Sequence, residues 1–550
     1  MDLEYEKEQQ RRLAILIEEL KAGKIHFSSH LHAKMSASVD AIRIKPDGTV
    51  DLSTVDASVR SMAFMSSIMR DREDMKAEIS IYEINKMFYD FLELNMGWLI
   101  KGAKERGMDA HEVGLALSSS AAYVENIIPS IRKCMEMLDD FWESLTAVCQ
   151  YHLQDFDGLK AVFGGDLFPS YQQNIASSSG LYLDVIALND PFSKSRHVFE
   201  SGSYKQAVYI FAKHVINLMD YKELALCDEH MPLVAIVPPT KFDESNREWL
   251  GSMIRSDTTK HLSTAFGRTF NDIDEVEDFL KGAAEPEDLV KLIVRKEMIL
   301  FDVEWEGDLL AQMKRAMANT DLRVASPTHA GRFLTGIIFG RMGQATDILQ
   351  RSRDFGSIPL LDAPTSWRYF NFALAHQSTD NLAYDRKELH MVHGLQRAAA
   401  TDAEWLGNIP PSALIEMRKQ GAMPEIREML SKGISEIAVA NPDGFYRTAD
   451  QVVANVQEAF DLHKQNIEAL KKKRWKFLGH DIGGWLVTGS LEIGAAVLGT
   501  PAIGLGALVA QNAFDLPKLK DLPKRNRETK SALDYAKRSP IGLLFSHGPK

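Results

Sequence analysis

Polar residues follow three short apolar runs of this sequence, and their types and positions could form one binding site. The runs Leu181–Leu188, Leu233–Val237 and Ile358–Leu361 end in Asn-Asp-Pro, Pro-Pro-Thr and Asp-Ala-Pro. In open α/β sheets, ligands bind beyond the carboxyl ends of the strands. In the simpler interpretation, these acids and prolines only end the strands, as they do in most loops. The residues of the predicted ligand site are Asp190, Thr240, Asp362, Trp367, Arg368 and His376.

Two histidine pairs have spacings that could suit metal ligands. His390 and His393 are three residues apart and could share a helix face, where His376 could join them. We favour a structural or solvated pair, because zinc sites use three or four protein ligands. The second pair, His30 and His32, lacks further ligands. The sequence therefore predicts no metal site and no cofactor.

The common catalytic motifs are absent from the sequence. It contains no P-loop, no complete dinucleotide fingerprint, no HExxH and no nucleophile elbow. Their absence argues against the common enzyme classes. Other kinds of enzyme stay open. We assign no catalytic residue and lean towards a role that is not enzymatic.

A glycine-rich apolar segment near the C-terminus, Ile482–Ala510, suggests a different chemistry. Its only ionisable side chain is Glu492, and Pro501 divides it into two arms. As one helix, its 29 residues would span roughly 43 Å, which exceeds a hydrocarbon core of about 30 Å. Glycines recur at every fifth position of the segment: Gly484, Gly489, Gly494, Gly499 and Gly504.

Two interpretations of this segment stay open. Basic clusters at 471–476 and 518–527 flank it, and cations at both ends suit an anionic membrane surface. The segment could therefore insert into a membrane, although a lone charged Glu492 in lipid is costly. Alternatively, it is a tightly packed helical hairpin buried in a soluble domain, since small residues four apart let helix backbones approach closely.

The remaining patterns predict a mixed, predominantly α chain. We expect a helical domain with a small β-hairpin over 1–165, and an α/β domain over 166–385 in which short apolar runs alternate with helices. Met298–Val303 is either a further strand or a helix end. A helical region follows over 386–475, and 476–550 holds the glycine-rich hydrophobic hairpin and a basic tail.

Apolar residues at alternating four- and three-residue steps predict a long helix over about 447–475. This heptad seam comprises Ala449, Val453, Val456, Phe460, His463, Ile467 and Leu470. It could dock within the same chain, transmit a change from the body to the tail, or pair with a second copy through 449–470. After it, the apolar end Ile541–Phe545 is expected to dock on the body.

Charge and cysteine content narrow the partners and the compartment. Residues 471–550 hold 14 Lys or Arg and 6 Asp or Glu, a charge of +8, which leaves −20 for 1–470 because the whole chain carries −12. The acidic body argues against nucleic acid as a partner. The basic tail could meet anionic lipid or the acidic body. Three cysteines without paired spacing indicate reduced thiols and a cytoplasmic protein, with peripheral or conditional membrane association.

Three functions fit these patterns. The first is a toxin-like or immune-effector-like protein whose body binds a ligand or partner and whose C-terminal segment engages or permeabilises a membrane. The second is a soluble enzyme or small-ligand-binding protein that uses the strand ends, with the C-terminal segment buried as a structural hairpin. The third is a scaffold that assembles through the heptad helix.

Overall fold

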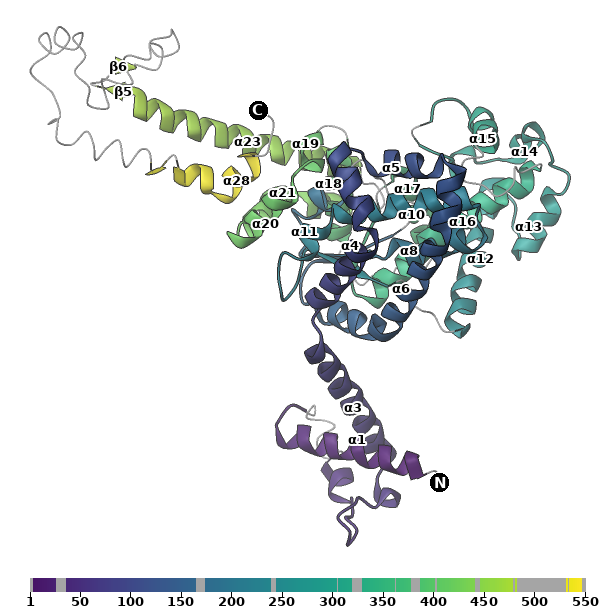
Figure 1. Ribbon diagram of the computed structural model, residues 1–550, viewed down its shortest axis with the longest axis vertical. Coiled ribbons are helices and arrows are strands. Elements are labelled where there is room, and N and C mark those ends of the chain that lie inside the picture. Colours follow the sequence, from purple (N-terminus) through teal and green to yellow (C-terminus); the bar gives the residue numbers. More distant parts are fainter. Residues whose placement is uncertain are drawn as a thin grey trace, which may run out of the picture.

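A computed structural model shows a predominantly helical chain with one small parallel sheet, which confirms the predicted fold class (Figure 1). It describes residues 1–550 except 1–2, 26–35, 165–173, 239–243, 304, 319–328, 362, 377–385, 401–402, 441–445, 478–479, 482–530, 533 and 547–550. The predicted glycine-rich hairpin at 482–510 lies outside the described residues.

Four parallel strands form the sheet, in the order β3-β2-β1-β4. The strands β2 (Val185–Asn189), β3 (Val234–Val237) and β4 (Ile358–Leu360) fall on the three predicted apolar runs. The sequence did not indicate β1 (Lys160–Phe163). The alternative offered for Met298–Val303 is decided in favour of a helix end, since η2 (Lys296–Met298) is a 3-10 turn and no strand follows it.

Helices cover the sheet and its edges. α4 (Ile81–Arg106) and α6 (Ala121–Asp155) contact β3, whereas α16 (Ala330–Asp354) and α18 (Arg386–Ala400) contact β4. Asn85 of α4 donates to the Val234 carbonyl at 3.2 Å and accepts from the Ile236 amide at 3.0 Å. This side chain occupies backbone groups of an edge strand that would otherwise be open to pairing with another chain.

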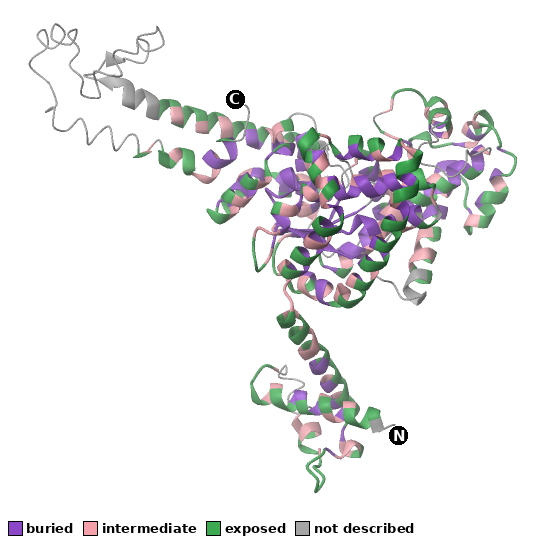
Figure 2. Cartoon of the chain, in the orientation of Figure 1, coloured by how far each residue is buried: buried purple, intermediate pink, exposed green. Residues whose placement is uncertain are grey.

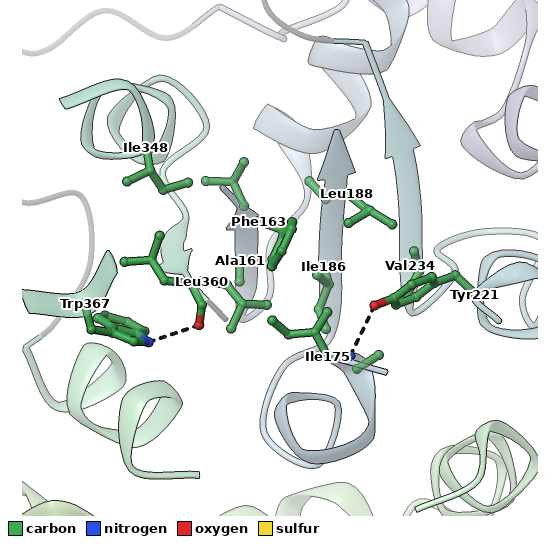
Figure 3. Packing of buried hydrophobic residues seen from close by; sticks show 14 of the residues in the cluster. Ala161, Phe163, Ile175, Ile186, Leu188, Tyr221, Val234, Ile348, Leu360 and Trp367 are labelled. Carbon is green, nitrogen blue, oxygen red and sulfur yellow. Dashed lines mark hydrogen bonds between the residues drawn. The ribbon is translucent and has the colours of Figure 1, made fainter. Parts of the chain in front are cut away.

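Two separate apolar clusters hold the chain together. The large cluster includes buried residues from Ile81 to Phe545 and surrounds the sheet (Figures 2 and 3). The small one holds α1 (Leu3–Lys21) against α3 (Ala57–Glu78), and Figure 1 shows this N-terminal arm standing away from the body. Its buried members are Leu13, Leu16, Val50, Val55, Val59 and Ala63. The predicted hairpin near residue 46 is reduced to one antiparallel bridge, Ile44 to Val50. The domain boundaries stay predictions.

The remaining helices before α23 lie in the body, except η1, which lies in the N-terminal arm. Their bounds are η1 (Leu52–Thr54), α5 (Ala110–Ser118), α7 (Ala176–Ser179), α8 (Pro191–Lys194), α9 (Arg196–Ser201), α10 (Tyr204–Met219), α11 (Lys222–Ala225), α12 (Glu244–Phe266), α13 (Ile273–Leu280), α14 (Pro286–Leu292), α15 (Leu309–Ala318), α17 (Pro364–His376), α19 (Glu404–Gly407), α20 (Pro411–Lys419), α21 (Met423–Ser431) and α22 (Ile434–Ala440).

The predicted heptad helix is present as α23 (Tyr446–Trp475), which extends from the body in Figure 1. Val452 and Val456, near its start, are buried in the large cluster. β5 (Lys476–Phe477) and β6 (His480–Asp481) follow it as an antiparallel pair. The C-terminal helix α28 (Pro540–Ser546) contacts α20, α21 and α23, which confirms that the apolar end docks on the body.

Candidate functional site

The strand order places a reversal of chain direction at the carboxyl edge of the sheet. From β1 the chain proceeds to β2 and then β3 on one side, whereas β4 lies on the other side of β1. In open parallel sheets, ligands bind where the order reverses in this way. The relevant strand ends are Phe163 of β1 and Leu360 of β4, which lie side by side in Figure 3.

Asp190 lies at this edge, directly after β2, but its carboxylate is enclosed by the protein. It is fully buried and accepts from the Trp142 indole at 2.9 Å, the Phe192 amide at 3.0 Å and the Ser193 hydroxyl at 2.6 Å. Burial raises the pKa of Asp190, while these hydrogen bonds act in the opposite direction. Asp190 caps α8 and ties α6 to the sheet, which is a structural role.

Trp367 and Arg368 lie on α17, just after β4. The Trp367 indole donates to the Leu361 carbonyl at 3.0 Å (Figure 3). It also donates to Gln396 at 3.1 Å and packs edge-on against His393. Burial, together with the nearby positive charges of Arg397 and Arg368, lowers the pKa of His393 to about 3. Arg368 is exposed, so a polar and cationic surface lies beside the end of β4.

His376 does not share this edge, because α17 carries it away. It lies 12 residues after Pro364, which is about 18 Å along a helix. There its Nε2 is 3.4 Å from Nδ1 of His261 on α12. The His261 Nε2 lies 2.9 Å from the Met298 carbonyl and must donate to it, so its Nδ1 accepts from His376. Burial lowers the pKa of His261 to about 4.

Thr240 and Asp362 lie outside the described residues, so the six predicted residues are only partly placed. Among the described ones, the structure brings Asp190, Trp367 and Arg368 to the carboxyl edge and separates His376 from them. A cavity beside Asn189 and Lys194 holds about 20 Å³, which is room for roughly one water molecule. It is too small for an organic ligand.

One nucleophile-and-base pair went unnoticed in the sequence. Ser195 Oγ lies 2.9 Å from Nε2 of His214 on α10, and both side chains are fully buried. Burial lowers the pKa of His214 to about 3, so the ring is neutral near pH 7. Because no substrate can reach the hydroxyl, the pair serves packing. Ser195 lies in the turn between α8 and α9, and its separation of 19 residues from His214 gives no local sequence signal for the pair.

The histidines proposed as a pair make separate contacts. His390 bonds Thr448 at 2.7 Å, whereas His393 packs on Trp367. Within the described ranges, no three His, Cys, Asp or Glu side chains gather closely enough to hold a metal ion. Nor does any described helix combine the length and apolar character needed to cross a membrane.

The described residues on both sides of the glycine-rich segment meet each other. Phe545 of α28 packs against Phe460 and His463 of α23, with ring centres 5.1 Å and 5.9 Å apart, and against Trp405 at 6.0 Å. Leu544 is fully buried beside them. The chain therefore leaves the body along α23 and returns to the same place at α28.

Comparisons with protein-family models, curated proteins and solved structures found no match to this chain.

Proposed function

We propose that this chain is a sensor or effector whose body binds a ligand or partner and whose segment 482–510 engages anionic membranes. The observation that carries the proposal is the α23–α28 pair. Its ring contacts hold together the two ends of a chain section that contains the least polar stretch of the sequence. α23 also extends from the body, so this section starts and ends away from the sheet (Figure 1).

The α23–α28 pair limits the form in which segment 482–510 would enter a bilayer. With α28 docked, both ends of 482–510 stay on one side of the membrane, so entry takes the form of a re-entrant hairpin. Pro501 lies where a hairpin would turn, and lysines at 471–473 and 518–520 would meet the anionic headgroups. Crossing once would instead remove α28 from the core, and the burial of Leu544 would be lost.

Vesicle experiments on the full chain test this proposal. We expect binding to liposomes that contain phosphatidylserine, with release of a trapped dye, and weaker binding to neutral liposomes. Gly494→Arg places a charge in the apolar segment and should abolish both, because an Arg at the bilayer centre costs about 2.5–3.5 kcal/mol or more. Glu492→Gln should ease insertion by removing the buried charge.

Two outcomes would contradict the membrane proposal. Either the wild-type chain neither binds nor permeabilises anionic liposomes, or a folded Gly494→Arg variant keeps full activity. If Gly494→Arg instead unfolds the chain, Glu492→Gln still separates the alternatives. A buried hairpin predicts no change in liposome binding with Glu492→Gln, whereas insertion predicts stronger binding. Truncation after Leu470 is unsuitable as a control, because it also removes the docked helix α28.

The strand order supports a second candidate function, which is binding of a small ligand at the carboxyl edge between β1 and β4. Exposed Arg368 would favour an anionic ligand there. Thermal unfolding with inorganic phosphate and ATP as probes tests this candidate. A melting temperature raised by either probe, and no longer raised in Arg368→Ala, would support it. If a probe raised the melting temperature of the wild type and of Arg368→Ala equally, a role for Arg368 would be excluded.

A further inference from the structure

Two tyrosines of α10 have similar cations beside their rings but different partners at the hydroxyl. A cation lies 5.5 Å from each ring centre, the Arg132 guanidinium for Tyr204 and the Lys213 ammonium for Tyr209. The Tyr204 hydroxyl accepts from Arg132 at 3.4 Å. The Tyr209 hydroxyl instead lies 2.6 Å from Nδ1 of His111, an exposed side chain of α5. Of these two tyrosines, Tyr209 is the one that the described residues provide with a base at its phenol.

Close packing of α5 on α10 holds this contact in place (Figure 1). Gly114 of α5 lies so near Tyr209 that an added Cβ would meet its ring at 2.7 Å and its backbone carbonyl at 3.0 Å. Asp109 begins α5 with a capping box, in which its carboxylate accepts from the Glu112 amide at 2.8 Å. The rings of His111 and Tyr209 meet edge to face, with centres 5.8 Å apart. The two helices therefore position the base at the phenol.

The pair has the arrangement of a nucleophile and its general base. Burial raises the pKa of Tyr209, and the nearby negative charge of Asp109 acts in the same direction. The phenol consequently keeps its proton near pH 7 and needs a base to remove it as a new bond forms. His111 can accept that proton at Nδ1 when its Nε2 carries the ring hydrogen. Because this contact is exposed, a reagent can reach it from solvent, unlike the buried Ser195–His214 pair.

The charges around the Tyr209 hydroxyl favour an anionic electrophile. Lys213 lies one turn after Tyr209 on the same side of α10. Burial lowers the pKa of Lys213 to about 8, so most of its ammonium groups are still charged at pH 7. A positioned ammonium stabilises the oxygens of a transferring phosphoryl group. The opposite charge of Asp109 is engaged at the α5 cap by the Glu112 amide. A phosphoryl donor therefore suits this place better than a neutral acyl donor.

We infer that Tyr209 is a nucleophilic tyrosine that takes a phosphoryl group from an activated phosphate, with His111 as general base and Lys213 as partner of the phosphoryl oxygens. In this step the phenol oxygen forms a bond to phosphorus, and the bond from phosphorus to the leaving group breaks. The phenol proton passes to Nδ1 of His111, and the leaving group keeps the bonding electron pair. The product is phosphorylated Tyr209, and no oxidant or reductant takes part. This inference rests neither on the membrane proposal nor on the ligand proposed at the strand edge.

A fluorophosphonate probe and mass spectrometry on the full chain test the reactive tyrosine. We expect the probe to label Tyr209, with loss of fluoride, at least about tenfold faster than Tyr204, although Tyr204 is 52% exposed. Tyr209→Phe should abolish the label at that position. His111→Gln keeps a hydrogen-bond acceptor but removes the base, so it should slow labelling about 100-fold. The matched control, Arg132→Gln, changes the partner of Tyr204 and should leave labelling at Tyr209 unchanged.

Acetyl phosphate, which can donate either a phosphoryl or an acetyl group, tests the class of electrophile. We expect a phosphoryl group on Tyr209, with acetate as the leaving group, and a several-fold slower reaction in Lys213→Gln that Lys213→Arg restores. Circular dichroism and thermal unfolding check that each variant keeps the fold. If Tyr209 gains no phosphoryl group, whether or not it is acetylated, the phosphoryl donor is wrong. Labelling of Tyr204 by the fluorophosphonate as fast as that of Tyr209, or an unchanged rate in His111→Gln, would overturn the reactive tyrosine itself.

Discussion

The carboxyl edge of the sheet and the α23–α28 pair are both places where the sequence predicts function, and they are built differently. At the edge, the carboxylate of Asp190 is fully buried among donors from α6 and α8. In the pair, Phe545 is held by Phe460 and His463, which are only partly buried. Removing a group from the edge leaves buried donors without acceptors. Removing one from the pair uncovers an apolar contact near solvent, so we expect α28 to detach while the sheet stays intact.

The largest effect is expected at the edge. Asp190→Ala should lower the free energy of unfolding by about 3–5 kcal/mol, because each buried donor left unpaired costs about 1–3 kcal/mol. Urea denaturation measures this loss. Ser193→Ala is the control, since it removes one of the donors and should cost only about 1 kcal/mol. Equal stability of the two variants would show that Asp190 has no structural role, and would return it to the candidate ligand residues.

The sheet shows what the sequence could and could not predict about the fold. Apolar runs ended by acids and prolines identified β2, β3 and β4 because their residues are buried on both faces. β1 has four residues, begins with a lysine and follows a long helix closely. Lys160 is buried because its ammonium donates to the carbonyls of Leu153, Gln154 and Phe156 at the end of α6. No local pattern shows that a lysine has such partners.

The sequence could predict which strand ends form the candidate site. It could not predict which side chains there are available to a ligand. Parallel strands bring Asp190 and Trp367 to one edge, as expected. Whether a polar side chain there is free for a ligand depends on partners distant in sequence, such as Trp142 for Asp190. Likewise, His376 meets His261, 115 residues away, because α17 continues past the edge. Spacing along the chain contains no signal for either contact.

The second-largest effect is expected from acid, which should lower the stability of the core. Burial lowers the pKa of His261 to about 4, and that of His214 and His393 to about 3. The unfolded chain binds these protons near pH 6.5, so stability is full above that pH and falls as the pH drops towards 4. His261 alone accounts for roughly 3 kcal/mol at most. Urea titrations at pH 7.5, 6 and 5 measure the slope, which His261→Gln should reduce. An unchanged slope would contradict the assignment.

A smaller and local effect is expected in the α23–α28 pair. Phe545→Ala removes the ring that contacts Phe460, Trp405 and His463, so amide hydrogen exchange in α28 should become about 10–100-fold faster. Unfolding of the sheet should change by less than about 1 kcal/mol, because α28 opens separately. Tyr535→Ala, on a side chain that is 79% exposed, is the control. Exchange that accelerates equally in β2 would show that α28 and the sheet unfold together.

The smallest effect concerns His463, and it distinguishes the two regions by pH alone. Burial lowers the pKa of His463 on α23, whose ring lies 5.9 Å from that of Phe545. Docked α28 therefore disfavours the protonated ring, so docking is complete above about pH 6.5 and weakens as the pH falls below it. Because His463 is half-buried, α28 exchange should accelerate only a few-fold between pH 7.5 and 5.5, after correction for the intrinsic rate. His463→Gln should remove this acceleration and leave the acid response of the core unchanged. If the variant keeps it, the change in α28 follows from the core histidines, and the two regions are coupled after all.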